Sequence, residues 1–251
     1  MRLLLQVLVC SWLLLLAGVA AADPATEGAR VLERVDREST RAADVTATID
    51  IVTVDADRTR TARKVKVWQK GTARRMVKIL APARLRGVGM LSLGSNRLYL
   101  YLPAFGRTRR IAGRDRGEPF MGSNFTQDDL TRMSYGSRFR AEVEAQSAET
   151  WTLRLDPLRP ADEPFHHLEL TVRKSDYQVV GIDCFDRAGA GPVRRLRASD
   201  FRRHGSQLLA YKVVAEDLAT HSRSTATLSD ARLDSGLKKD IFTRRYLRRS
   251  P

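Results

Sequence analysis

Cysteine is scarce in this sequence, with only two among 251 residues. Two cysteines cannot hold together a chain of this length, which excludes a disulfide-rich scaffold. Cys10 lies in the apolar N-terminal segment, and Cys184 lies in an apolar stretch beside Ile182 and Phe185. A lone cysteine in such surroundings is typical of a small buried hydrophobic residue rather than a reactive thiol.

Motifs of catalysis and metal binding are also missing. The chain has no phosphate-binding glycine loop, no G-x-S-x-G, no H-E-x-x-H and no paired C-x-x-C. His166 and His167 are adjacent, so on a strand they would point to opposite faces and could not share a metal ion. His204 and His221 stand alone among basic and polar residues. We therefore expect no enzyme, no metal and no cofactor.

Acidic residues are outnumbered by basic ones. The chain has 44 Lys and Arg against 29 Asp and Glu, which gives a formal net charge of +15. This excess predicts anionic partners without specifying them. With 43% apolar and 29% charged residues, the composition excludes both a disordered chain and a polytopic membrane protein.

Only one long hydrophobic run is present, at the N-terminus. Arg2 precedes an apolar stretch over 3–19, and Ala20-Ala21-Ala22 offers a cleavage site. This layout predicts a secretory signal peptide over 1–22. The alternative is an uncleaved anchor, since the run over 3–22 is almost long enough to span a membrane. We expect a periplasmic protein whose mature part, 23–251, forms one domain.

The spacing of apolar residues changes early in the mature chain. Helical spacing predicts a helix over 26–37, and from residue 45 onward the spacing is two, as in half-buried strands. Because no helix-length segments separate most of the strands, they indicate an antiparallel sheet, sandwich or barrel. Strands are predicted at 45–51, 65–67, 76–80, 90–93, 98–102, 139–145, 151–155, 168–172, 179–185, 196–201, 208–215 and 225–233.

Two segments interrupt this series, at 82–89 and 113–137. In the second, Ser123 or Asn124 is predicted to cap a short helix through 127–130, whose acidic residues suit a first helical turn. A last short helix is predicted within 238–247.

Arginines gather just before the second interruption, where the only acid among them is Asp115. Nucleic acid is the usual partner of such runs, but an exported protein would instead meet anionic lipid or protein. A simple solvated face explains the run equally well. The cluster consists of Arg107, Arg109, Arg110, Arg114 and Arg116.

The strand predicted at 98–102 is apolar on both faces, with tyrosines on one and leucines on the other. Such a strand is either sandwiched or part of a sheet that curls around something. If the leucine face is covered, the tyrosine face lines a cavity, or the reverse. Phe120, Met121 and Phe125 would then lie on a loop that covers this surface, although ordinary core packing explains them equally well.

One block of the sequence resembles a known family. The block reads N-R-L-Y-L-Y-L-P at 96–103, G-R-T-R-R-I at 106–111, F-M-G-S-N-F at 120–125 and D-D-L at 128–130. It resembles the pattern W-x-Y-L-P, R-R-I, F-M-G-S-D-F-x-x-x-D-L of the bacterial outer-membrane lipoprotein-sorting proteins, relatives of the carrier LolA. Leu98 stands where many members have Trp, Arg97 where they have an acid, and Asn124 where they have Asp.

The resemblance implies a mainly β fold with a few helices (α+β). Its curved antiparallel sheet would form an incomplete, LolA/LolB-like β-barrel, closed by helices around an apolar cavity for acyl chains. The residues expected to form the cavity and its lid are Trp68, Leu98, Tyr99, Leu100, Tyr101, Leu102, Phe120, Met121, Phe125 and Leu130.

The resemblance also implies a carrier of lipids or acylated lipoproteins, working with an inner-membrane transporter such as a pump of the RND/MMPL type. The arginines of 107–116 would hold an anionic headgroup or the anionic membrane surface. We expect a monomer that binds no nucleic acid. The alternative is a periplasmic lipid-sensing regulator of a membrane signalling protein, similar to RseB.

Overall fold

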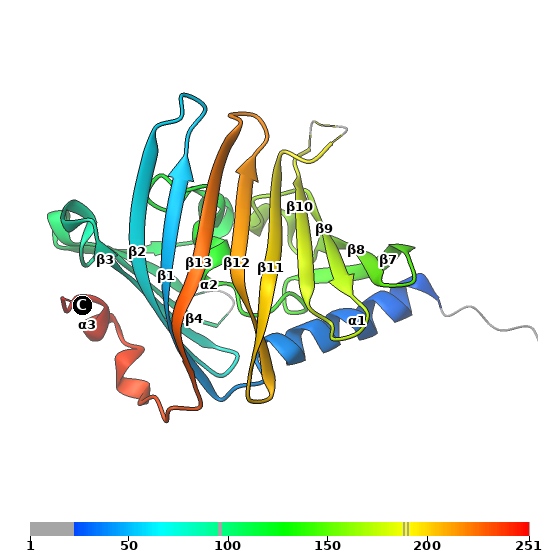
Figure 1. The fold of residues 1–251 in the computed structure, drawn as a ribbon, viewed down its shortest axis with the longest axis horizontal. Coiled ribbons are helices and arrows are strands. Elements are labelled where there is room, and N and C mark those ends of the chain that lie inside the picture. The colour runs from blue at the N-terminus through cyan, green and yellow to red at the C-terminus, as the bar shows by residue number, and fades with distance from the viewer. Residues whose placement is uncertain (1–22, 95–96, 188, 190, 251) are drawn as a thin grey trace, which may run out of the picture.

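Figure 1 shows the fold in a computed structural model that describes residues 23–94, 97–187, 189 and 191–250. The predicted signal peptide over 1–22, with Cys10, lies outside the described residues. Within these ranges, no helix is both long and apolar enough to cross a membrane.

The described strands form one antiparallel sheet in the order β6-β5-β4-β3-β2-β1-β13-β12-β11-β10-β9-β8-β7. Strands adjacent in sequence pair with each other except β6 and β7, which form the two edges, and β1 pairs with β13 in the middle of the sheet. Their bounds are β1 (Asp44–Val54), β2 (Arg60–Lys70), β3 (Arg74–Ala81), β4 (Gly89–Leu93), β5 (Leu98–Leu102), β6 (Arg107–Ile111), β7 (Phe139–Gln146), β8 (Thr150–Pro157), β9 (His167–Arg173), β10 (Val179–Phe185), β11 (Arg194–His204), β12 (Gln207–Asp217) and β13 (Ser222–Leu233).

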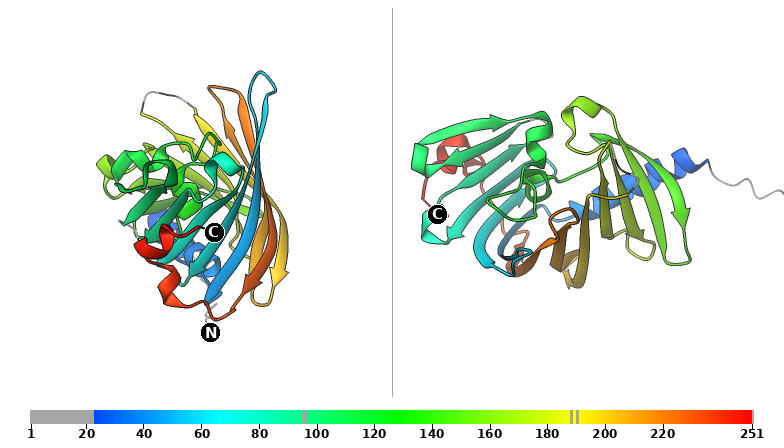
Figure 2. Two further views of the ribbon diagram at one scale, coloured as in Figure 1. Left: turned by 90° about the vertical axis from the view of Figure 1, so that its left-hand side faces the viewer. Right: turned by 90° about the horizontal axis from the view of Figure 1, so that it is seen from above.

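The sheet is strongly curved but not closed, because its edge strands β6 and β7 do not pair with each other. Figure 2 shows its two ends curling toward the same side, with α2 (Gln127–Thr131) between them. The other helices are α1 (Pro24–Ser39) and α3 (Arg244–Leu247). This architecture confirms the predicted fold class: a mainly β, incomplete antiparallel barrel with a few helices.

The predicted helix over 26–37 and the predicted strands are present, and most of them extend a few residues further. Strand β6 was not predicted, because its arginines break the apolar alternation; as an edge strand it pairs only with β5. The expectation that His166 and His167 point apart is wrong. Since β9 begins only at His167, His166 is free to turn, and the two Nδ1 atoms lie 3.0 Å apart.

The two faces of the sheet pack against different partners. The concave face forms the main core, which includes Leu98 and Leu100. On the outer face, Met76 and Leu91 pack against Phe242 and Leu247 of the C-terminal segment. Around this outer cluster lie partly buried apolar side chains of the same face, namely Trp68, Leu93, Tyr99, Leu237 and Tyr101.

A buried lysine binds this C-terminal segment to β3. Lys78 on β3 is 1% exposed, and its Nζ donates to the carbonyl oxygens of Tyr246 at 2.8 Å and Arg249 at 2.6 Å. These two carbonyl oxygens satisfy the buried ammonium group. The C-terminal segment that carries them therefore covers the outer face of β3.

Helix α1 closes the concave side beside β7. Val31, Leu32 and Val35 bury its apolar stripe in the main core. Gly28 allows the close approach, since a Cβ at this position would lie 2.7 Å from the carbonyl oxygen of Ala141. The α1–β7 contact therefore requires a residue without a side chain.

Helix α2 begins with a capping box. The Thr126 hydroxyl accepts from the Asp129 amide at 3.1 Å, and the Asp129 carboxylate accepts from the Thr126 amide at 2.7 Å. The predicted caps at Ser123 and Asn124 are therefore wrong by two or three positions. Ser123 instead donates to the Phe120 carbonyl at 2.8 Å, which turns the loop just before the helix.

Asn124 attaches this loop to β13. Its Nδ2 donates to the Ser222 hydroxyl at 2.6 Å, and its Oδ1 accepts from the Ser224 hydroxyl at 2.7 Å. The amide thus acts as a donor to one serine hydroxyl and as an acceptor from the other.

Two carboxylates on α2 form the centre of a buried ion-pair network. The side chains of Asp128 and Asp129 are 3% and 7% exposed. Asp128 pairs with Arg132 at 2.9 Å and with Arg138 at 2.6 Å, and Asp129 pairs with Arg194 of β11. The network therefore joins α2 and its flanking segment to the sheet.

The network also controls the ionisation of Asp128. Burial alone raises the pKa of this carboxyl, but the attraction of Arg132 and Arg138 outweighs burial and lowers the pKa below its ordinary value of 3.8. A carboxyl whose pKa is lowered in the folded state stabilises the fold above its unfolded-state pKa. That stabilisation is lost as the pH falls through the folded-state pKa.

We predict that Asp128→Asn lowers the free energy of unfolding by about 3–5 kcal/mol at pH 7, because it breaks the buried ion pairs of Asp128 with Arg132 and Arg138 and leaves these arginines with only Asp129 and Glu163. The difference from wild type should begin to shrink below about pH 4, where Asp128 becomes protonated in the unfolded chain, and should disappear only as the pH falls through the lowered folded-state pKa. Urea unfolding between pH 3 and pH 8 measures both effects. A difference that stays constant over this range would contradict the assignment.

Candidate functional site

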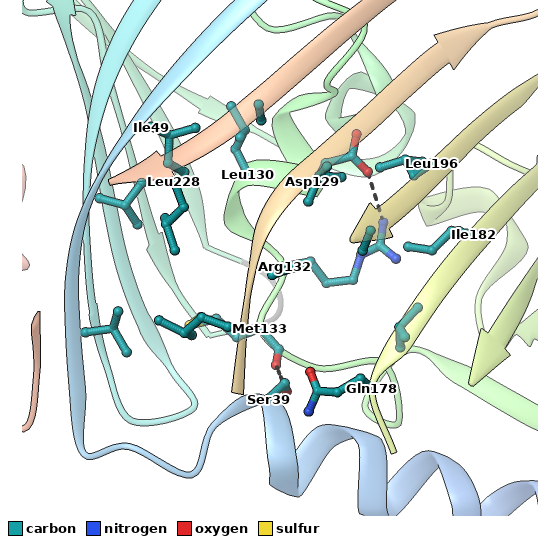
Figure 3. Close-up of a pocket in the computed structure, with 18 of the residues that line it drawn as sticks. Ser39, Ile49, Asp129, Leu130, Arg132, Met133, Gln178, Ile182, Leu196 and Leu228 are labelled. Atoms are coloured by element: carbon teal, nitrogen blue, oxygen red, sulfur yellow. Dashed lines mark hydrogen bonds and ion pairs between the residues drawn. The ribbon is translucent and has the colours of Figure 1, made fainter. Parts of the chain in front are cut away.

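A cavity of about 410 Å³ lies on the concave side of the sheet. Its walls come from β1, β2 and β10–β13, and it is bounded by α2, the segment 132–135 and the end of α1 (Figure 3). Small-molecule sites commonly measure about 300–1,000 Å³. The cavity is therefore large enough for a ligand.

The cavity wall is mainly apolar. Ile49, Ile182, Val213 and Leu228 line it and remain only partly buried, although they point to the concave side of the sheet. Alternation along each strand places them there. An apolar ligand would remove this surface from water.

Polar groups gather at the end of the cavity near the C-terminus of α1. Ser39 donates from its hydroxyl to the Met133 carbonyl at 3.3 Å, as Figure 3 shows. Gln207 donates from Nε2 to the Ser39 carbonyl at 3.1 Å. Gln69, Arg75 and Gln178 also line the cavity. These contacts tie α1, the segment 132–135 and β12 together at one end of the site.

Two further charged residues line the cavity. Arg132 lies with its Nη2 3.6 Å from Oδ1 of Asp129 (Figure 3). Its guanidinium also lies over the Tyr135 ring at 4.7 Å. Burial raises the pKa of the Tyr135 hydroxyl, so this residue is neutral near pH 7. The side of the cavity formed by α2 is therefore polar but internally paired.

The structure separates the residues predicted from the sequence into three groups. Phe125 and Leu130 line the cavity. Leu98, Leu100 and Phe120 are fully buried in the main core, and Leu102 and Met121 pack against it. The other three lie on the outer face, where the C-terminal segment packs against them: Trp68, Tyr99 and Tyr101.

Most of the cavity wall was missed by the sequence analysis. The missed residues lie mostly on β10–β13 and on β1 and β2, outside the block that carries the family resemblance. Alternation identified these strands but not which of their faces stays uncovered. The small residues Ala198, Ala210 and Ala226 on the inner face are the one signal that could have indicated an open interior.

The predicted basic surface is present in part. Arg107, Arg109, Arg110 and Arg114 are exposed, and Arg109 pairs with Glu118 at 3.2 Å. The predicted place of Arg116 in this surface is wrong. Arg116 is 7% exposed and lies 3.8 Å from Asp128 in the buried network.

An exposed aromatic residue lies next to these arginines. Phe105 is 71% exposed in the turn between β5 and β6, where a short 3-10 helix spans Pro103–Phe105. Gly106 follows at φ 59°, a left-handed conformation that glycine adopts without strain. This turn therefore presents an apolar tip beside cationic side chains.

The cysteine of the described residues lies outside the cavity. Cys184 is buried, as its apolar strand predicted, and burial raises the pKa of its thiol to about 12. Across the described part of the chain, no group of three or more His, Cys, Asp and Glu side chains is placed to hold a metal ion.

Comparison with known proteins identifies the fold. A family model described as an uncharacterized protein matches residues 71–249. A comparison with curated proteins finds no match. Three solved structures are similar over most of the chain, at identities that show likeness of fold.

The first is a DUF1329 family protein from Desulfovibrio piger, with a TM-score of 0.82 and 18% identity over 90% of this chain and 99% of that one. The second is a putative outer membrane lipoprotein-sorting protein domain from Vibrio parahaemolyticus, with a TM-score of 0.78 and 22% identity over 90% and 100%. The third is a LolA superfamily protein from Nitrosomonas europaea, with a TM-score of 0.73 and 20% identity over 87% and 99%.

The match over 71–249 covers more than half of the chain, and the three structures share the incomplete barrel. The chain belongs to the family of uncharacterized proteins that the family model describes, and its fold is LolA-like.

Proposed function

We propose that this protein is a periplasmic carrier that binds lipids, or the acyl chains of lipoproteins, in the cavity of its incomplete barrel. The observation that carries the proposal is the partly exposed apolar wall formed by Ile49, Ile182, Val213 and Leu228. A protein that binds nothing gains little from such a surface, whereas an acyl chain would cover it.

The energetics support this proposal. Each buried CH₂ group contributes about 0.8 kcal/mol, so a sixteen-carbon chain offers on the order of 10 kcal/mol before the costs of binding. Binding of this kind needs an apolar cavity and no catalytic group. Transfer toward the outer membrane, with an inner-membrane transporter of the RND/MMPL type as the source, would follow from a carrier role.

The turn at Phe105 supports contact with a membrane surface. Near an anionic bilayer, each arginine contributes about 1 kcal/mol, and an exposed aromatic tip can enter the headgroup region. Arg107 and Arg114 are exposed close to this turn in the sequence. We propose that this face docks on anionic membranes during loading or delivery.

We predict that Ala198→Trp abolishes binding of a fluorescent acyl probe to the mature protein. Ala198 lines the cavity from β11, so an indole there would occupy the space of the ligand. The matched control is Ser199→Trp, since Ser199 is the next residue on the strand and is exposed. Titration of both variants and circular dichroism separate blocked binding from unfolding. Unchanged affinity in a folded Ala198→Trp variant would contradict the proposal.

We predict that combining Phe105→Ser with Arg107→Glu and Arg114→Glu weakens binding to phosphatidylglycerol vesicles at least about tenfold, because it removes the apolar tip and reverses two charges. The control is Arg203→Glu with Lys212→Glu, which makes the same charge change at exposed positions of β11 and β12. Vesicle co-sedimentation measures both. Equal losses of vesicle binding in the two variants would show an effect of net charge and would contradict the proposed docking face.

A further inference from the structure

Arg75 occupies an unusual position in the cavity. It lies on β3 in register with Gln69 of β2 and lines the polar end of the cavity. Its Nη1 donates to the carbonyl oxygens of Arg132 at 3.0 Å and Leu130 at 3.4 Å, and its Nη2 donates to the side-chain oxygen of Gln69. All of these acceptors are neutral.

The charge of Arg75 is therefore uncompensated by the protein. Among the ion pairs of the described residues, none involves Arg75, and burial lowers the pKa of its guanidinium to about 10. Asp129 is the acid that lines the same cavity, and it is already paired with Arg194 and lies 3.6 Å from Arg132. Arg75 is partly buried, and a cation removed even in part from water is costly unless something neutralises it.

Two donors at this site also lack acceptors. Within the described part of the chain, Nε of Arg75 and Nη1 of Arg132 are buried without a hydrogen-bond partner. Both residues line the cavity, one from β3 and the other from the segment after α2. Unmet donors and unmet positive charge thus coincide at the polar end of the cavity.

We propose that the cavity selects amphiphiles whose headgroup is anionic, a carboxylate or a phosphate, with the guanidinium of Arg75 as the counter-charge and the apolar wall holding the acyl chain. This inference rests on the proposed carrier function and adds a substrate class to it. Planar guanidinium groups match both oxyanions through paired N–H donors. A cationic headgroup would instead be repelled by Arg75, and a neutral one would leave its charge unpaired.

A purely structural role for Arg75 is the competing account. Its bonds to the Leu130 and Arg132 carbonyls hold the segment that follows α2 against β3. That role predicts that replacing Arg75 weakens every ligand alike. Headgroup recognition predicts a loss confined to anionic ligands, so ligands with matched chains separate the two.

The experiment compares palmitate, hexadecyl phosphate and hexadecanol, which share a sixteen-carbon chain, by displacement of a fluorescent acyl probe from the mature protein at pH 8. The variants are Arg75→Gln and Arg75→Lys. The matched control is Arg74→Gln, because Arg74 precedes Arg75 on β3 and alternation directs it to the opposite face. Circular dichroism of each variant verifies the fold.

We expect wild type and Arg74→Gln to prefer one or both anions over hexadecanol. Arg75→Gln should lose about 10- to 100-fold in affinity for the preferred anion, as expected for a charged hydrogen bond, and keep its affinity for hexadecanol. Arg75→Lys should retain part of the preference, since lysine keeps the positive charge but lacks the paired N–H donors of the guanidinium. Preference for palmitate alone indicates a fatty-acid ligand, and preference for the phosphate alone indicates a phospholipid.

Two results would overturn the inference while leaving the carrier function intact. One is equal binding of all three ligands by wild type, which needs no folded variant to observe. The other is an equal loss for anions and hexadecanol in Arg75→Gln. Failure of wild type to bind any of the three would instead contradict the proposed function itself.

Discussion

The buried carboxylates of α2 are the constraint on which the rest of the site depends. Asp128 and Asp129 draw arginines from the segments on either side of α2 and from β11 into one network. Without it, a five-residue helix would have too few contacts to stay on the sheet. With it, α2 and the segment 132–135 lie at a fixed distance from the concave face, and the space between them is the cavity.

The cavity follows from a mismatch between a long sheet and the few elements that cover it. Strands β3–β6 bury their inner face in the core beside Phe120, and α1 buries the inner face near β7. The middle strands have no such cover, so Ile49 and Leu228 remain accessible. On the outer face the C-terminal segment supplies cover where Tyr99 and Tyr101 would otherwise be exposed. Apart from exposed residues such as Phe105, partly exposed apolar surface thus faces the interior, where a ligand can use it.

Local signals in the sequence were enough for the fold. Alternating apolar residues predicted the strands, helical spacing predicted α1, and the block over 96–130 indicated the LolA-like barrel. The cavity wall was harder to predict from the sequence. Leu98 and Tyr99 are both apolar, and only the position of the distant C-terminal segment decides which of their faces lies inside. The sequence did not single out Arg75, and it placed Arg116 in the basic surface rather than in the buried network. Their roles depend on partners far along the chain, such as the Arg132 carbonyl and Asp128.

Native mass spectrometry of the mature protein, purified from the periplasm without detergent, tests the central claim most directly. The account predicts a bound mass that lipid extraction identifies as a lipid or an acylated peptide. A clean apo mass that persists after incubation with total membrane lipid would contradict it. That result would favour the alternative of a regulator that binds a membrane signalling protein.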